Sequence, residues 1–267
     1  MATQQSDARV PARPSARILS LVVPATVVFA IVVAIWEVLV RTGAGGEFGL
    51  PAPLSVGAAV IELAQEEYFY EAVRTTTLES AYGFIVGASG GFALGVLIGS
   101  SEIARRTLHP FVVLFQSMPK PALAPMFVVW FGYGMNSKVM TAAAIAFFPV
   151  LINTIAGFDG VPDDMRLLMR SYGASRRQAI TKFIVPDALP MIFAGLKTAA
   201  SLALVGAIVA EFIGALEGMG SLIQSFNFAL QLDLAFAVLV YLSVLGFVFY
   251  EAVELVERRV VFWRDKS

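Results

Sequence analysis

Residues 80–98 read SAYGFIVGASGGFALGVLI, a run of 19 residues without one charged side chain. A helix needs about 20 apolar residues to cross the hydrocarbon core of a bilayer, so this run predicts a membrane-spanning helix. Glycine recurs at every fourth position in and just after the run, which aligns these glycines on one helix face and lets another backbone approach closely. We assign this glycine stripe to helix packing: Gly83, Gly87, Gly91, Gly95 and Gly99.

The composition of the whole chain also indicates a membrane protein. Hydrophobic residues make up 58% of the 267 residues and charged residues only 15%, against roughly 45–50% and about 25% in soluble domains. The formal net charge of −1 lacks the basic excess that nucleic-acid binding requires. No cysteine and a single histidine argue against thiolate or imidazole catalysis and against a metal site. We therefore expect no catalytic residue, no metal and no cofactor in this chain.

Five further apolar runs have a similar length, so the sequence predicts an all-α polytopic membrane protein with six transmembrane helices. The first run is too long for a signal peptide and is not followed by a small-residue cleavage site, so we interpret it as a retained anchor. The predicted spans are 18–40, 80–98, 111–131, 139–158, 191–213 and 234–250.

The positions of Lys and Arg predict the orientation, because short positive loops are retained in the cytoplasm. Of the 19 basic residues, 14 lie on the side of the two termini, three lie on the opposite side and two lie within spans. Both termini are therefore predicted to be cytoplasmic. The expected organisation is an N-terminal tail (1–17), a transmembrane domain (18–256) with one long cytoplasmic loop (159–189), and a C-terminal tail (257–267).

The third predicted span contains three prolines between residues 119 and 125, and each removes a backbone donor, so the helix must be kinked or interrupted. Broken helices inside membranes border protein or water. Lys120 lies between two of these prolines and either attracts an anion in a translocation pathway or is a cytoplasm-facing or ion-paired lysine. We assign Lys120, Gln116 and Met118 to a candidate pathway.

The fifth predicted span carries a second small-residue stripe, and its next four-residue member is acidic. The series is Gly195, Ala199, Ala203, Ala207 and Glu211. An ionisable group inside a span usually faces the bundle interior or a watery cavity. Glu211 therefore either lines the translocation pathway or, since it lies near the outer end of the span, caps a helix or snorkels at the interface.

The long cytoplasmic loop contains the most specific motif, because residues 170–186 read RSYGASRRQAITKFIVP. Gly173 accepts backbone conformations closed to other residues and can separate two helices, while Pro186 is expected to end the element that follows. Between them, Ala174 and Ser175 present a small surface suited to a partner's groove.

This loop resembles the EAA loop of ATP-binding cassette importer permeases, in which a glycine precedes an I-x-L-P motif by nine residues. Four residues match that pattern at its spacing: Gly173, Phe183, Val185 and Pro186. Leu-Leu-Met at 167–169 stands where the family has Glu-Ala-Ala. The resemblance implies that the loop docks on a separate ATPase through these residues: Arg170, Gly173, Ala174, Ser175, Arg176 and Pro186.

Other segments are similar to the branch of these permeases that imports nitrate, sulfonates, taurine, bicarbonate and similar small solutes. They are LPAP at 50–53, ALAP at 122–125, WFGYG at 130–134, FP at 148–149 and AE at 210–211. The resemblance extends over about residues 18–264 of the chain.

The resemblance implies a multi-pass permease subunit in the cytoplasmic (inner) membrane of a bacterium, surrounded by lipid. Such a subunit is not an enzyme and moves a small anion or zwitterion, such as a sulfonate or nitrate, inward by alternating access. The implied partners are a second copy of the chain, two ATPase subunits with ATP and magnesium, and an external solute-binding protein, but no nucleic acid. Two alternatives stay open: an ion-coupled secondary transporter that uses Glu211 and the broken third span, and a membrane scaffold without transport.

Overall fold

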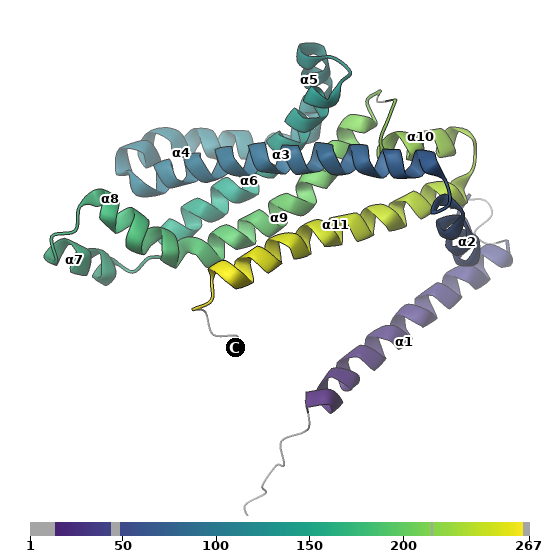
Figure 1. Ribbon diagram of the computed structural model, residues 1–267, viewed down its shortest axis with the longest axis horizontal. Coiled ribbons are helices and arrows are strands. Elements are labelled where there is room, and N and C mark those ends of the chain that lie inside the picture. Colours follow the sequence, from purple (N-terminus) through teal and green to yellow (C-terminus); the bar gives the residue numbers. More distant parts are fainter. Residues whose placement is uncertain (1–13, 44–48, 215, 264–267) are drawn as a thin grey trace, which may run out of the picture. The chain divides into compact units, whose positions relative to one another are not determined.

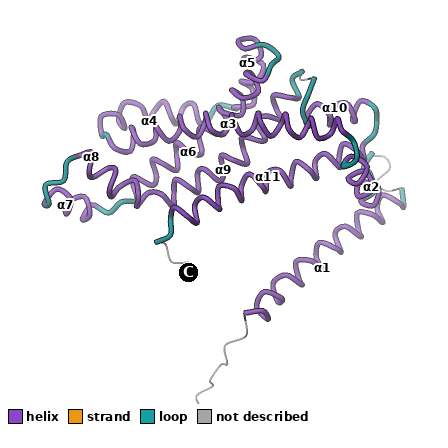
Figure 2. The backbone as a smooth tube through the Cα atoms, in the orientation of Figure 1, coloured by secondary structure: helices purple, strands orange, loops and turns teal. Residues whose placement is uncertain are grey.

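The computed structural model describes residues 14–43, 49–214 and 216–263, and these residues are almost entirely helical (Figure 2). No strand occurs within those ranges. The all-α polytopic fold class predicted from the sequence is therefore confirmed.

The chain comprises two compact units, Met1–Ala59 and Val60–Ser267. Most of the predicted N-terminal tail (1–13) and the last residues of the predicted C-terminal tail (264–267) lie outside the described residues.

The first unit contains α1 (Pro14–Arg41), a helix of 28 residues, and most of α2 (Pro53–Leu63). Near the end of α1, the Glu37 carboxylate accepts hydrogen bonds from Arg41 Nε at 2.5 Å and from the backbone N–H of Leu54 at 3.2 Å. Leu54 lies in the first turn of α2, where unpaired N–H groups and the helix dipole favour a negative charge. This carboxylate therefore binds the first turn of α2.

The second unit is built on four long helices, α3 (Glu67–Ser100), α6 (Met135–Asp159), α9 (Val185–Glu211) and α11 (Leu232–Val260). The first three pack against one another, and α11 packs against α9 (Figure 1). A short helix, α10 (Met219–Phe228), lies between α9 and α11 in the chain and contacts both of them and α3.

The glycine stripe of α3 lies in the contact with α6. All five glycines are buried. A Cβ added at Gly87 would lie 3.0 Å from the Cα of Ala143, and one added at Gly95 would lie 2.6 Å from the Cβ of Thr154. Both distances are shorter than ordinary van der Waals contact, so the absence of a side chain is what lets the two backbones approach this closely.

The third predicted span is broken at its prolines. The helix α4 (Glu102–Gln116) is followed by a 3₁₀ turn, η2 (Lys120–Leu123), and then by α5 (Ala124–Phe131). The segments before and after the break are bent by 88° relative to each other, and α5 projects away from α4 in Figure 1.

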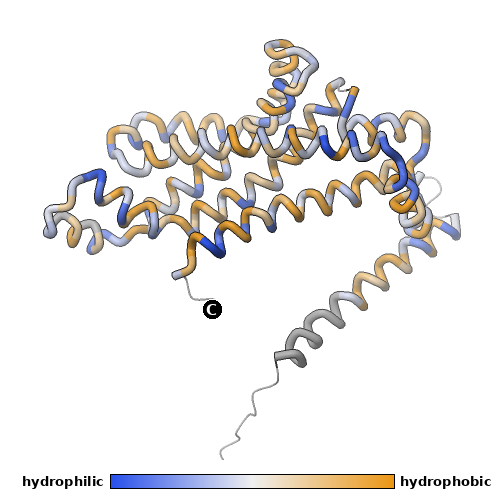
Figure 3. Tube along the Cα trace, in the orientation of Figure 1, coloured by the Kyte–Doolittle hydropathy of each residue, from blue (hydrophilic) through white to orange (hydrophobic). Residues whose placement is uncertain are grey.

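Among the described residues, four helices are long and apolar enough to cross a membrane, and the bent pair around residues 117–119 would make a fifth. In Figure 3, apolar residues run along these helices and hydrophilic residues gather toward the ends of the bundle. This pattern fits a polytopic membrane protein. The count of six spans, with α1 as the first, and the cytoplasmic termini stay predictions.

Candidate functional site

The loop at 159–189 forms two short helices, α7 (Asp163–Ser171) and α8 (Arg176–Ala179), joined by a turn at Gly173. Gly173 has φ +69°, in the left-handed region that favours glycine. Ser175 begins α8 with a capping box: its Oγ accepts from the N–H of Gln178 at 3.3 Å, and its own N–H donates to Gln178 Oε1 at 2.9 Å. This turn therefore has a defined conformation set by its sequence.

Two of the predicted coupling residues fasten the loop to the bundle. Ala174 packs against a buried cluster around Phe158. Arg176 donates a hydrogen bond of 2.8 Å to the carbonyl oxygen of Ser100, at the C-terminal end of α3, where the helix dipole favours a cation. The side chain of Arg170, also predicted as a coupling residue, lies outside the described residues.

The part of the loop that is free to meet a partner lies at the turn and on α7. Tyr172 is 83% exposed, and apart from Gly173 and its two chain neighbours, no described residue has an atom within 4 Å of a Cβ added at Gly173. Leu167 and Leu168 are exposed on α7. Sequence reasoning missed Tyr172, although its place directly before the motif glycine was a usable signal.

Pro186 does not end the element in which it lies, contrary to the sequence prediction. It occupies the first turn of α9, and the helix continues from Arg176 to Glu211. A π-helical turn, η3 (Ile180–Ile184), directly precedes it. The wider hydrogen-bond spacing of this turn accommodates a residue without a backbone donor inside a continuous helix.

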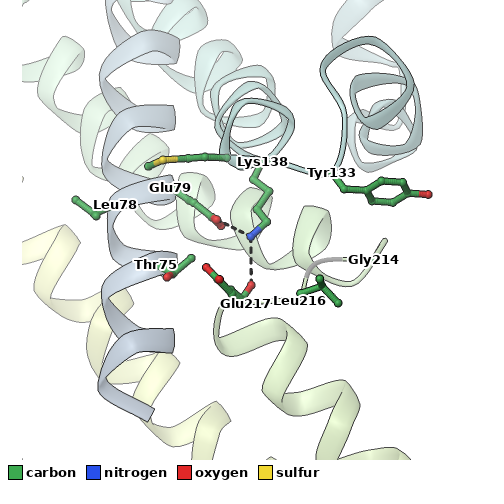
Figure 4. Close-up of a pocket in the computed structure, with 10 residues that line it drawn as sticks. Thr75, Leu78, Glu79, Tyr133, Lys138, Gly214, Leu216 and Glu217 are labelled. Carbon is green, nitrogen blue, oxygen red and sulfur yellow. Dashed lines mark hydrogen bonds and ion pairs between the residues drawn. The ribbon is translucent and has the colours of Figure 1, made fainter. Parts of the chain in front are cut away.

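At the opposite end of α9, four polar side chains from three helices meet inside the protein. They form what we call the polar clamp, which consists of Thr76, Glu79, Lys138 and Glu211. Lys138 Nζ donates to Glu79 Oε1 at 2.6 Å and to the backbone carbonyl of Glu217 at 3.2 Å (Figure 4). The clamp is almost completely enclosed, since the exposed fraction is 1% for Glu79, 0% for Glu211 and 7% for Lys138.

The clamp also holds the first turn of α10. Thr76 Oγ1 donates to Glu211 Oε1 at 2.7 Å and accepts the N–H of Met219 at 2.8 Å. Glu211 Oε2 accepts the N–H of Gly220 at 2.5 Å. Two of the N–H groups that a helix leaves unpaired at its start are thereby satisfied, and a carboxylate lies where the dipole of α10 favours it. These hydrogen bonds are those of a helix cap, one of the roles expected for Glu211, and its place in a pathway stays a prediction.

Sequence reasoning found Glu211 but missed its partners. Glu79 precedes Gly83 by four residues and so continues the glycine stripe in the N-terminal direction. Lys138 precedes Ala142 by four residues on α6, and both side chains are buried. The same extrapolation that identified Glu211 would therefore have identified Glu79.

A pocket of about 590 Å³ borders the clamp and is lined by Glu79, Lys138 and Tyr133, among others (Figure 4). A second pocket, of about 420 Å³, shares Thr75 and Leu78 with the first. Within the described residues, no group of three histidine or acidic side chains is placed to hold a metal ion.

The residues predicted for the pathway lie at the break between α4 and η2. Lys120 is half-buried, and its Nζ donates to the carbonyl oxygen of Gln116 at 2.6 Å and lies 4.8 Å from the ring centroid of Phe148. The Gln116 and Met118 side chains are exposed. The three residues thus lie together at the break, away from the clamp.

The helical bundle and the broken span define a multi-pass membrane protein with a structured loop. The family model described as "Binding-protein-dependent transport system inner membrane component" matches residues 91–262. This match covers more than half of the 267 residues, and the chain belongs to that family.

Curated relatives have similar lengths. The chain is 32% identical over 242 residues to the formylaminopyrimidine transport permease protein ThiX of Halalkalibacterium halodurans, which covers 91% of this chain and 96% of the relative. It is 27% identical over 242 residues to the taurine transport system permease protein TauC of Escherichia coli, covering 89% and 88%.

A solved structure has the same fold. A chain of the MetNI methionine ABC transporter, in a crystal form described as inward facing, superimposes with a TM-score of 0.58. The match covers 72% of this chain and 93% of that chain at 20% identity. At this identity the likeness concerns the fold alone.

These matches establish the class of the protein. It is a permease subunit of an ATP-binding cassette importer, and it is not itself an enzyme, because ATP is used by a partner ATPase. A solute-binding protein belongs to the same kind of system. The ion-coupled and scaffold alternatives raised by the sequence are thereby set aside.

Proposed function

We propose that this permease works as a homodimer in a bacterial inner membrane, with six spans in each copy and both termini in the cytoplasm. Two ATPase subunits, which use ATP and magnesium, dock at the 159–189 loops, and an external binding protein delivers the solute from the other side. The basic residues concentrated on the predicted cytoplasmic side support this orientation. The exposed apolar residues of α7 and the exposed Tyr172 support docking at the loop.

One observation carries the coupling role: a single helix runs from the loop to the polar clamp. The segment Arg176–Glu211 is helical over 36 residues, which at 1.5 Å per residue is about 54 Å. Its first turn is capped by Ser175 in the loop, and its last residue caps α10. A displacement of the loop by the ATPase is thus carried by one element to the far end of the bundle, where α10 is attached.

We assign solute contact to the break in the third span and not to Glu211. Both oxygens of Glu211 are already hydrogen-bonded, and its side chain is fully buried. Lys120, by contrast, is half-buried and has ammonium protons beyond the one that it donates to Gln116. In a dimer, Lys120, Gln116 and Met118 would contact the solute on its way through.

The solute that we propose is a small anion or zwitterion, of the sulfonate or nitrate kind. The relatives' names include a permease for taurine and one for formylaminopyrimidine. A lysine at a membrane break is costly without a counter-charge, and a negatively charged solute group would supply one.

The coupling role is tested with Gly173→Asp in the permease expressed together with its ATPase. Asp is one of the few L-residues that adopt positive φ, so the turn is retained while a charge enters the docking surface. We expect loss of ATPase co-purification and of ATP hydrolysis linked to transport. Gly160→Asp is the matched control, because Gly160 is exposed in the same loop and has φ −70°.

The control should leave both measurements near the wild-type values. If Gly173→Asp retained the ATPase and its transport-linked hydrolysis as well, the loop would not be the docking site.

A further inference from the structure

The polar clamp contains more acidic than basic groups. Glu79 and Glu211 contribute two carboxyl groups, and Lys138, which is hydrogen-bonded to Glu79, is the one cation of the clamp. With every group ionised, the enclosed cluster would carry one net negative charge. An uncompensated charge inside a membrane protein destabilises the fold, so one further positive charge is needed to neutralise the clamp.

The hydrogen bonds distinguish the two carboxyl groups. Glu211 accepts a hydroxyl proton on Oε1, from Thr76, and a backbone N–H on Oε2, from Gly220. Each oxygen faces a donor, and α10 begins beside them. This surrounding suits the ionised form, because a protonated Glu211 would point its own hydrogen at a donor or lose one of these bonds.

Glu79 is in a different situation. Its Oε1 accepts from Lys138 Nζ, but its buried Oε2 has no hydrogen-bond partner among the described residues. This oxygen is buried, although Glu79 is one of the residues that line the pocket of about 590 Å³. A buried carboxylate oxygen without a donor has lost its hydrogen bonds to water and has gained none in the protein, which destabilises the fold.

One proton would remove both the net negative charge of the clamp and the unpaired acceptor on Glu79. On Glu79 Oε2 it cancels the excess charge and converts an orphaned acceptor into a donor. The proposed acceptor is the carboxyl group of Glu211, which is bound by Thr76, three residues before Glu79 on the same face of α3. The other groups that surround Glu79 and Glu211 are the Thr76 hydroxyl, the Lys138 ammonium and the Gly220 amide, and beyond them Glu217, which lines the pocket.

We propose that Glu79 carries a proton at neutral pH and donates it in a hydrogen bond to Glu211. This proton keeps α10 attached to α3, α6 and α9. Glu79 acts as a positioning residue, through Lys138 and Glu211, and does not touch the solute. Removal of the proton restores the net negative charge next to Glu211 and weakens the attachment of α10. The inference concerns the clamp alone and stands whether or not the coupling loop has its proposed role.

The direct test is infrared spectroscopy of the full-length permease at neutral pH in a detergent that contains no carbonyl group. A protonated carboxyl group gives a C=O stretching band that a carboxylate does not. We expect this band in the wild type and its loss in Glu79→Gln, which removes the group that carries the proton. The band should also weaken in Glu211→Gln, which removes the excess negative charge. Absence of the band from the wild type overturns the proposal, and so does a band of unchanged strength in Glu79→Gln.

A second test uses the different consequences of the two substitutions. Glutamine at position 79 keeps the acceptor for Lys138 and replaces the proposed O–H donor by N–H, so solute uptake should stay within about twofold of the wild type. Glutamine at position 211 points an N–H group at Thr76 or Gly220, so uptake should fall by about tenfold or more. Equal losses in the two variants contradict the placement of the proton on Glu79.

The pH profile separates this role from a purely structural one. Because the proton leaves as the pH rises, the melting temperature of the wild type should fall in alkaline buffer. That fall should be reduced in Glu79→Gln, which has no proton to lose at this position. An unchanged alkaline fall in Glu79→Gln contradicts the proposal, even if the variant folds less well than the wild type.

Discussion

Two adjacent glycines on α3 allow a sharp test, because the same change from glycine to alanine should raise stability at one position and lower it at the next. A Cβ at Gly91 would collide with the backbone carbonyl of Phe147 on α6 and would lie 3.2 Å from the backbone nitrogen of Leu151. A Cβ at Gly90 would lie 3.5 Å from the Phe147 ring, an ordinary contact, and Gly90 is exposed. Gly91→Ala should therefore destabilise the bundle, whereas Gly90→Ala should not.

The difference between the two variants isolates the cost of separating the helices. Replacing glycine by alanine inside a helix contributes about 0.5–1 kcal/mol of stability at either position. Overpacking costs about 1–3 kcal/mol, and it applies only at Gly91, where the neighbours are backbone atoms that cannot rotate away. Gly90→Ala should thus gain about 0.5–1 kcal/mol, and Gly91→Ala should lie about 1–3 kcal/mol below it.

The measurement is thermal unfolding of the purified full-length permease in one detergent at one scan rate, because unfolding of such proteins is a rate process as well as an equilibrium. With about 2–4 °C per kcal/mol for a chain of this size, the two melting temperatures should differ by about 2–12 °C. Equal melting temperatures, or a lower value for Gly90→Ala, would refute the assignment of the glycine stripe to the contact with α6.

Two further predictions concern lysines. Lys120→Gln should lower solute uptake in proteoliposomes while leaving the bound ATPase in place, and unchanged uptake would remove Lys120 from the pathway. Lys197 Nζ lies 2.8 Å from Glu254 Oε2 and 2.6 Å from Glu257 Oε2, so Lys197→Met should cost about 1–3 kcal/mol in thermal unfolding, allowing for partial exposure. Arg258→Gln, which breaks an ion pair of a more exposed side chain, is the control and should change stability by less than about 1 kcal/mol.

Features that depend on one helix could be predicted from the sequence. The prolines near Lys120 removed backbone donors, and the helix breaks there with a bend of 88°. Gly173 separates α7 from α8 through its positive φ. This feature could be predicted because it depends on the residue type at one position and not on contacts with another helix. Pro186 was misjudged because a local rule, that proline ends a helix, ignores the π-helical turn that the surrounding packing supports.

The polar clamp could be predicted only in part, because its members belong to different helices. Glu79 and Lys138 each continue a four-residue series on their own helix, as Glu211 does. The four-residue spacing in the sequence therefore indicates the helix face on which each residue lies. Which residues meet depends on how far each helix is displaced along its neighbours, and no single helix carries that information.

The clamp explains why these small-residue faces pack in one register. Faces of glycine and alanine are nearly uniform, so a helix displaced by one turn, about 5.4 Å, would find similar contacts. The polar ends are not uniform, because the same displacement would part Lys138 from Glu79 and leave the buried Lys138 ammonium without its acceptor. The glycine stripe permits close approach and the clamp selects the register, so α3, α6 and α9 should respond to the coupling loop as one rigid body and not by sliding.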